Sequence, residues 1–117
     1  MDIPYASLVW IGRSKDDYVK FPRQVQRKMG FWLFEAENGE HPSGAKPLKG
    51  FGGASVIELI SDFDGDTYRA VYTVKLSDTI CVLHCFQKKS SSGRATSKQD
   101  LDTIKERLAI AVKEHGK

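Results

Sequence analysis

Cationic side chains cluster in two segments of this sequence, and clustered ammonium and guanidinium groups favour binding to phosphate oxygens. Residues 75–99 contain a single acid, Asp78, and residues 41–57 contain none. The cations concerned are Lys46 and Lys49 in the earlier segment and Lys88, Lys89, Arg94 and Lys98 near the end of the later one. The net charge of +3 is mild. The distribution of the charge, rather than its total, therefore indicates a polyanionic partner.

Arg69 is a further candidate for phosphate binding because it interrupts an apolar segment that alternates like a strand. In an extended strand Arg69 shares one face with Val71 and Thr73. Tyr68 and Tyr72 point to the other face, where they are expected to belong to the core. Two interpretations of the arginine remain open: a surface side chain that extends over apolar neighbours, or a bidentate phosphate clamp on an open cationic face of the sheet.

Alternation in the next strand, residues 79–88, separates the two adjacent lysines. Lys88 is expected on the face of His84, and Lys89 on the face of Leu83 and Cys85. Only one of the lysines can therefore lie on the face of the arginine. The register between the strands cannot be read from the sequence, so both lysines remain candidates for contact with a phosphate or for proton transfer.

The histidines and cysteines do not predict a metal site or a disulfide. Cys81 and Cys85 are four residues apart in a predicted strand, about 13 Å at about 3.3 Å per residue. That exceeds the separation a disulfide allows, so we expect two buried, reduced thiols. The three histidines lack metal-ligand spacing. His84 alone lies in a predicted strand, where it is either a packed, hydrogen-bonded residue or a catalytic one.

Periodicity predicts the helices and the first strand. Residues 6–12 form a short strand that Gly12 ends, and Ser14 with Asp17 resembles a capping box that opens a helical turn over residues 14–20. A longer helix begins near Pro22 and ends near Gly39. Its apolar face comprises Val25, Met29, Trp32 and Ala36. A last helix follows Ser97 and runs to His115, with Leu101, Ile104, Leu108 and Val112 along one face.

Residues 54–61, 67–76 and 79–88 alternate with period two and are joined by short turns, of which Asp64–Gly65 is a strong hairpin signal. They predict a three-stranded antiparallel meander. A hydrophobic content of 40% and a charged content of 28% are typical of a folded chain. We therefore expect a single α+β domain over residues 1–117: a small antiparallel sheet of the N-terminal strand and the meander, with the N-terminal helices and the C-terminal helix on one face.

Four motifs in a fixed order resemble the phage-derived branch of the RelE/HigB toxin superfamily. They are KPLKGFGG followed by IEL, then GDTYRAVY, VLHCFQKKS and KQDLDTIKERL, and together they span roughly residues 40 to 112. Two positions depart from the pattern. Ile60 stands where relatives commonly carry an arginine, which removes a possible phosphate contact, and Thr96-Ser97 stands where many relatives have a proline.

The resemblance implies a RelE-like fold and the toxin of a type II toxin–antitoxin system. Such a toxin is a ribosome-dependent mRNA endoribonuclease that needs no metal or cofactor and is restrained by a helix-turn-helix antitoxin. It directs the 2′-hydroxyl of the RNA onto the adjacent phosphate. The resemblance implies Arg69, Lys88 and Lys89 as catalytic residues and Lys46 and Lys49 as RNA-binding residues. Position and charge add His84 as a catalytic candidate and Arg94 and Lys98 as further RNA-binding candidates. The expected partners are the antitoxin, the ribosome and mRNA, and the toxin alone is expected to be a monomer.

An alternative function is a module that binds nucleic acid or antitoxin without cleavage, as in a degenerate prophage remnant. The arginine missing at Ile60 keeps this alternative open. The sequence has no apolar run of the roughly 20 residues that cross a bilayer. Its N-terminus also lacks the basic residues that open a signal peptide. We therefore expect a cytoplasmic protein without a membrane partner.

Overall fold

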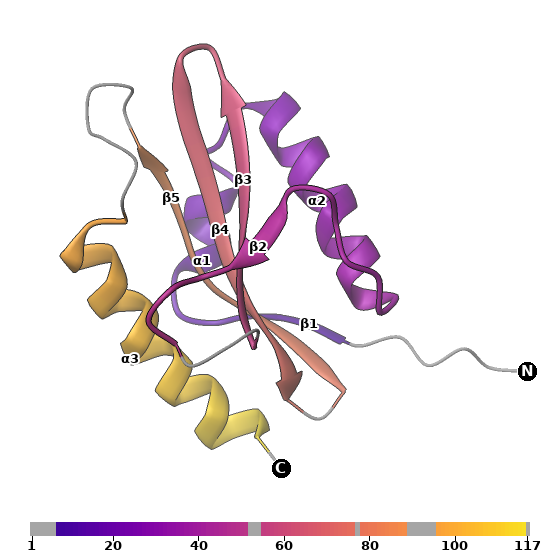
Figure 1. Ribbon diagram of the computed structural model, residues 1–117, viewed down its shortest axis with the longest axis vertical. Coiled ribbons are helices and arrows are strands. Elements are labelled where there is room, and N and C mark those ends of the chain that lie inside the picture. Colours follow the sequence, from indigo (N-terminus) through magenta and orange to yellow (C-terminus); the bar gives the residue numbers. More distant parts are fainter. Residues whose placement is uncertain (1–6, 52–54, 77, 89–95, 117) are drawn as a thin grey trace, which may run out of the picture.

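The computed structural model describes residues 7–51, 55–76, 78–88 and 96–116, apart from the side chain of Lys75. Its elements follow the order β1, α1, α2, β2, β3, β4, β5, α3 (Figure 1). Their bounds are β1 Ser7–Trp10, α1 Ser14–Tyr18, α2 Arg23–Glu37, β2 Ala45–Pro47, β3 Val56–Phe63, β4 Asp66–Leu76, β5 Thr79–Lys88 and α3 Lys98–His115. The predicted α+β class is confirmed.

The strands form one five-stranded sheet in the order β1-β5-β4-β3-β2. The predicted meander β3–β4–β5 is its centre, and Asp64 and Gly65, with φ of 53° and 86°, form the predicted tight turn between Phe63 and Asp66. Two features differ from the prediction. β1 pairs with β5 in parallel, so the sheet is mixed, and the short strand β2 adds a fifth member at the other edge.

Helices cover both faces of the sheet, which corrects the expectation that they share one face. The core around α2 contains Val25, Met29, Trp32 and Ala36, as predicted, together with Tyr68 and Tyr72 from β4. The core under α3 contains Ile104 and Ala111 with Val71 from β4. Alternate side chains of β4 therefore belong to two different cores. Apolar side chains on both faces of a strand require cover on both sides.

The ends of the helices show which local signals were correct. Ser97 caps α3 by accepting a hydrogen bond from the Asp100 amide at 3.1 Å, and Gly39, with φ of 80°, follows the end of α2. The capping box predicted at Ser14 is wrong: the buried Ser14 hydroxyl instead donates to the carbonyl of Val82 at 3.1 Å. It thereby ties α1 to β5.

In the last turn of α3 the inward position is Ala111, whereas Val112 is 48% exposed. The predicted apolar face is therefore right for Ile104 and wrong for Val112. The face of an α-helix rotates slightly at each turn, so a spacing of four residues repeated twice drifts away from the core.

A β-bulge in β5 changes the alternation of that strand. Tyr72 pairs with Val82 and Val71 pairs with His84, so Leu83 is an extra residue opposite β4. Leu83 belongs to the core under α3, whereas Cys85 belongs to the core around α2. The prediction that Leu83 and Cys85 share a face is therefore wrong. Arg107 of α3 donates to the Leu83 carbonyl at 3.0 Å and so fastens the bulge to the helix.

Candidate functional site

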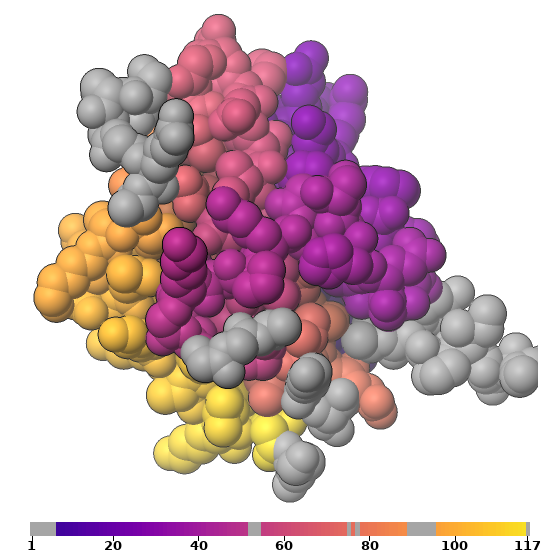
Figure 2. All heavy atoms as spheres, in the orientation of Figure 1, coloured from indigo at the N-terminus to yellow at the C-terminus, as the bar shows by residue number. Residues whose placement is uncertain are grey.

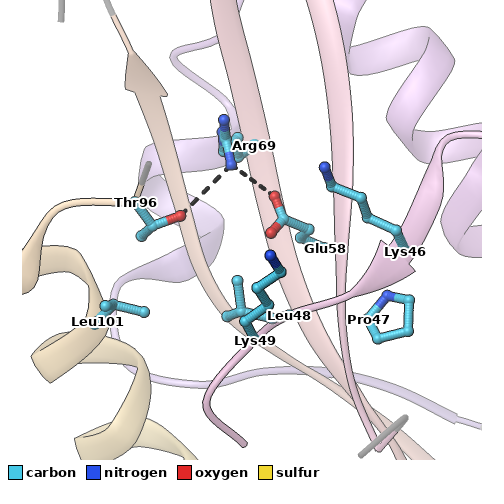
Figure 3. A pocket seen from close by; sticks show the side chains of 8 residues that line it. All are labelled: Lys46, Pro47, Leu48, Lys49, Glu58, Arg69, Thr96 and Leu101. Atoms are coloured by element: carbon cyan, nitrogen blue, oxygen red, sulfur yellow. Dashed lines mark hydrogen bonds and ion pairs between the residues drawn. The ribbon is translucent and has the colours of Figure 1, made fainter. Parts of the chain in front are cut away.

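A pocket of about 460 Å³ opens on the α3 side of the sheet. Its floor is the β3–β4 pair, one wall is β2 with the segment after it, and the other wall is the start of α3 (Figure 3). Figure 2 shows residues 45–51 lying beside α3 on this face of the molecule. The lining residues are Lys46, Pro47, Leu48, Lys49, Glu58, Arg69, Thr96 and Leu101. Three segments distant in sequence therefore meet around one hollow.

Arg69 and Glu58 form a buried ion pair in the floor of the pocket. The Nη1 atom of Arg69 donates to Oε1 of Glu58 at 2.7 Å, and the exposed fractions of the two side chains are 10% and 5%. The same Nη1 lies 3.5 Å from the hydroxyl of Thr96 (Figure 3). Arg69 is thus an enclosed guanidinium oriented by a carboxylate, rather than an arginine lying over an open sheet face.

Strand pairing brings Lys46 to the same place. Lys46 of β2 pairs with Glu58 of β3, and residues paired across antiparallel strands project to the same face with Cβ atoms about 5 Å apart. Lys49 follows in the segment after β2, which lies beside α3, and the buried Leu48 next to it holds that segment against the sheet. Both lysines are exposed. The pocket therefore combines three cations with one carboxylate.

The register between β4 and β5 places Lys88 relative to Arg69. Lys88 pairs with Thr67, and Phe86 pairs with Arg69. Lys88 therefore projects to the face of Arg69, but it does not line the pocket, and its side chain is half-exposed. Lys89 lies outside the described residues, as does Arg94.

Lys98 lies at the first position of α3, where its ammonium group is 2.9 Å from Asp102. It is exposed and does not line the pocket. Of the eight residues that the sequence proposed, Arg69, Lys46 and Lys49 thus come together in the pocket, while Lys88 and Lys98 lie outside it.

His84 has a different environment from the pocket residues. Its Nε2 lies 2.8 Å from Asp100 and its Nδ1 lies 3.4 Å from Arg107, while its ring stacks on Phe86 at 4.8 Å. A guanidinium can only donate, so Nδ1 is the acceptor and Nε2 carries the proton. Both ring nitrogens are therefore engaged in fastening α3 to β5, and His84 does not line the pocket.

The two thiols and the two strand tyrosines lie in the cores, as predicted. Cys81 and Cys85 are free and buried, in the separate cores on the two faces of the sheet. Burial raises the pKa of the Cys85 thiol to about 12 and that of the Tyr72 hydroxyl to about 12. Within the described residues no three His, Cys, Asp or Glu side chains are grouped to hold a metal ion.

Glu58 and Thr96 line the pocket but were not predicted as members of the site. Glu58 had a usable signal: it is an acid within the apolar segment VIELI, and an acid is rarely buried without a partner. An arginine in the adjacent strand was the natural partner. Thr96 had no such signal, because its position depends on how α3 packs against the sheet.

Comparisons with known proteins agree with this architecture. A family model described as phage-derived protein Gp49-like matches residues 16–109. A solved structure, the toxin–antitoxin complex RelBE2 from Mycobacterium tuberculosis, aligns with a TM-score of 0.50 at 16% identity, covering 77% of this chain and 98% of that chain. No curated protein matches the sequence. None of the helices in the described residues is long and apolar enough to cross a membrane. The predicted family resemblance and fold are confirmed.

Proposed function

This chain belongs to the Gp49-like family of phage-derived proteins, and from that premise we propose that it is the toxin of a type II toxin–antitoxin system. We propose further that it is a ribosome-dependent endoribonuclease acting on mRNA. The observation that carries this proposal is the pocket, where Lys46 and Lys49 face the buried Arg69–Glu58 pair. It offers charge for a phosphate and a carboxylate for proton transfer within one hollow.

The scissile phosphate binds among the three cations. Lys46 and Lys49 are exposed and attract the RNA backbone, while Arg69, fixed by Glu58, stabilises the extra negative charge of the transition state. A guanidinium that is already oriented needs little reorganisation as charge develops. Removal of one such donor typically lowers the rate by about 10²–10³-fold.

Glu58 is the proton acceptor of this mechanism. Its carboxylate takes the proton of the 2′-hydroxyl, the 2′-oxygen attacks phosphorus, and the bond from phosphorus to the 5′-oxygen breaks. Lys46, which pairs with Glu58 across the strands, returns a proton to the leaving 5′-oxygen. The products are a 2′,3′-cyclic phosphate and a 5′-hydroxyl. Lys88 on the same face and Lys98 at the start of α3 bind more distant phosphates.

The test is cleavage of mRNA on purified ribosomes programmed with a defined message. We expect fragments that end in a 2′,3′-cyclic phosphate. Glu58→Gln retains a hydrogen-bond acceptor for Arg69 and should lower the cleavage rate by about 10²–10⁴-fold while RNA affinity is kept. The double variant Lys46→Ala/Lys49→Ala should lower both the cleavage rate and the RNA affinity. Lys15→Ala, an exposed lysine of α1, serves as the control.

Binding without cleavage is the second candidate function, and one observation favours it. Ile60 pairs directly with Arg69, at the position where relatives commonly carry an arginine. If the wild-type protein protects mRNA from added nuclease on the ribosome but produces no new ends, the binding module replaces the enzyme. If it neither binds nor cuts, both proposals fail.

The expected partner of the toxin is a helix-turn-helix antitoxin, and the expected location is the cytoplasm. The fold of the toxin–antitoxin complex RelBE2 supports the proposal of an antitoxin partner. Co-expression with the product of the adjacent gene should abolish growth arrest and give a complex that co-purifies. Growth arrest that persists in the presence of that product would reject it as the antitoxin.

A further inference from the structure

The outward face of α2 carries two arginines followed by two phenylalanines. Arg23, Arg27, Phe31 and Phe34 follow one another at spacings of four, four and three residues, which places them on one stripe of the helix. All four are exposed, and the phenylalanines are 58% and 57% exposed. The inward stripe of the helix is separate and supplies its side of the core with Val25, Met29, Trp32, Leu33 and Ala36.

The positive charges of this face lie toward the N-terminal end of α2, where positive charge does not stabilise a helix. The segment from Arg23 to Phe34 contains no acid, and the first turn of α2 holds none. A helix N-terminus carries partial positive charge, so carboxylates there are favourable and arginines are not. Arg23, in the first turn, therefore gains nothing from the helix terminus, and Arg27 lies one turn beyond it. A partner that brings carboxylates to this end would satisfy the side chains and the helix terminus together.

The phenylalanines give the same surface an apolar end. Two aromatic rings one helical turn apart form a patch into which apolar side chains of another helix fit, as in helix-to-groove recognition. We propose that this face, Arg23, Arg27, Phe31 and Phe34, binds an acidic amphipathic helix of a partner protein. Leucine-like side chains of the partner cover the two rings, and its carboxylates pair with the two arginines.

The proposed docking face lies on the other side of the sheet from the pocket. α2 packs on the face that contains Tyr68 and Tyr72, whereas the pocket opens on the face of Glu58 and Arg69 beside α3 (Figure 1). A helix bound to α2 therefore leaves the pocket open to RNA. This inference does not depend on the proposed function, because the contact is independent of catalysis.

The test uses two synthetic helical peptides and the full-length, ¹⁵N-labelled protein. Both peptides carry leucines at i, i+3 and i+7, and their other exposed positions are glutamate in one and lysine in the other. We expect the acidic peptide to shift the amide signals of α2 and to bind at least about tenfold more tightly than the basic one. Arg23→Glu with Arg27→Glu should reverse this preference. That variant adds acids to the first turns, which favours the helix.

Phe31→Ser with Phe34→Ser should remove binding of the acidic peptide. Ile110→Ser on α3 is the matched control, since Ile110 is also an exposed apolar side chain, and it should bind normally. Equal affinity for the two peptides, or unchanged binding by the phenylalanine variant, overturns the proposal. A wild-type dimer that the phenylalanine variant converts to a monomer also overturns the proposal, because the face then binds a second copy of this chain. Loss of RNA binding without loss of peptide binding in the arginine variant assigns the arginines to RNA and overturns it too.

Discussion

The guanidinium of Arg69 and the carboxylate of Glu58 are joined at 2.7 Å across two neighbouring strands, with little exposure of either side chain. Burial removes both charges from water, and their mutual attraction offsets only part of that cost. The pair is therefore weak evidence for stability, yet the loss of one partner leaves an uncompensated charge in the floor of the pocket. Substitutions at these positions must be interpreted with this coupling in mind.

Arg69→Ala alone should destabilise the protein by about 3–5 kcal/mol, because Glu58 then remains buried without its counter-ion. The double variant Glu58→Leu/Arg69→Met should recover most of that loss, although it remains inactive. Urea unfolding of the wild type, Glu58→Leu, Arg69→Met and Glu58→Leu/Arg69→Met closes a double-mutant cycle and measures the coupling. If Arg69→Ala is as stable as the wild type, the pair is not structurally coupled, and Arg69→Ala becomes a simple test of the phosphate clamp.

Lys46→Ala/Lys49→Ala should leave stability within about 0.5 kcal/mol of the wild type, because both side chains are exposed. The same variant should weaken binding to single-stranded RNA and flatten its salt dependence. The slope of log K against log salt should fall by about 1.4 if each lysine contacts one phosphate. An unchanged slope would remove both lysines from the interface, and Lys15→Ala provides the reference slope.

The Nε2 atom of His84 should carry a proton, because Asp100 accepts from that nitrogen and Arg107 donates to the other. Nitrogen chemical shifts of the imidazole report the tautomer directly. His84→Ala removes contacts to both α3 residues and should destabilise the protein by about 1–3 kcal/mol. A proton found on Nδ1 would mean that Arg107 lies elsewhere in solution.

Alkaline pH should destabilise the protein through Cys85. Burial raises the pKa of its thiol from 9.0 to about 12, so the folded chain retains a proton that the unfolded chain releases. The contribution of the protonated Cys85 thiol to the free energy of unfolding is fully present below about pH 9 and falls as the pH rises toward 12. The loss should reach about 1–2 kcal/mol by about pH 10.

The denaturant midpoint measured at about pH 8 and pH 10 tests this expectation, and Cys85→Ala should show a smaller decrease than the wild type. Equal decreases in the two proteins would assign the effect to other buried groups. Tyr72, whose pKa is also about 12, contributes at higher pH.

Local signals in the sequence predicted every element except β2 and pointed to three of the residues that line the pocket. Alternation identified the meander, the Asp64–Gly65 turn fixed one register, and the acid-free segments pointed to Lys46 and Lys49. Predictions failed where the outcome depended on packing between distant segments. Whether α3 covers the face of α2 or the opposite face depends on both faces of β4 being apolar, which gives the helix two possible sides.

The burial of Arg69 could not be predicted from its own strand. An arginine between apolar residues fits a surface position as well as a buried one, and the choice depends on Glu58 in the adjacent strand. The hydrogen bond from Ser14 to Val82 is a similar case. In the sequence, a serine at the start of a helix resembles a cap, whether its hydroxyl bonds to the helix or, as here, to a carbonyl of a strand.

The extra residue of β5, Leu83, decides which face of the sheet carries Lys88. Because Leu83 has no counterpart in β4, every side chain after it is shifted by one step, which turns Lys88 toward the same side as Arg69. In strict alternation with Cys81, Lys88 would instead project to the face of Tyr68 and Tyr72, where α2 packs. The extra residue thus keeps the ammonium group of Lys88 on the pocket side of the sheet and out of the core around α2.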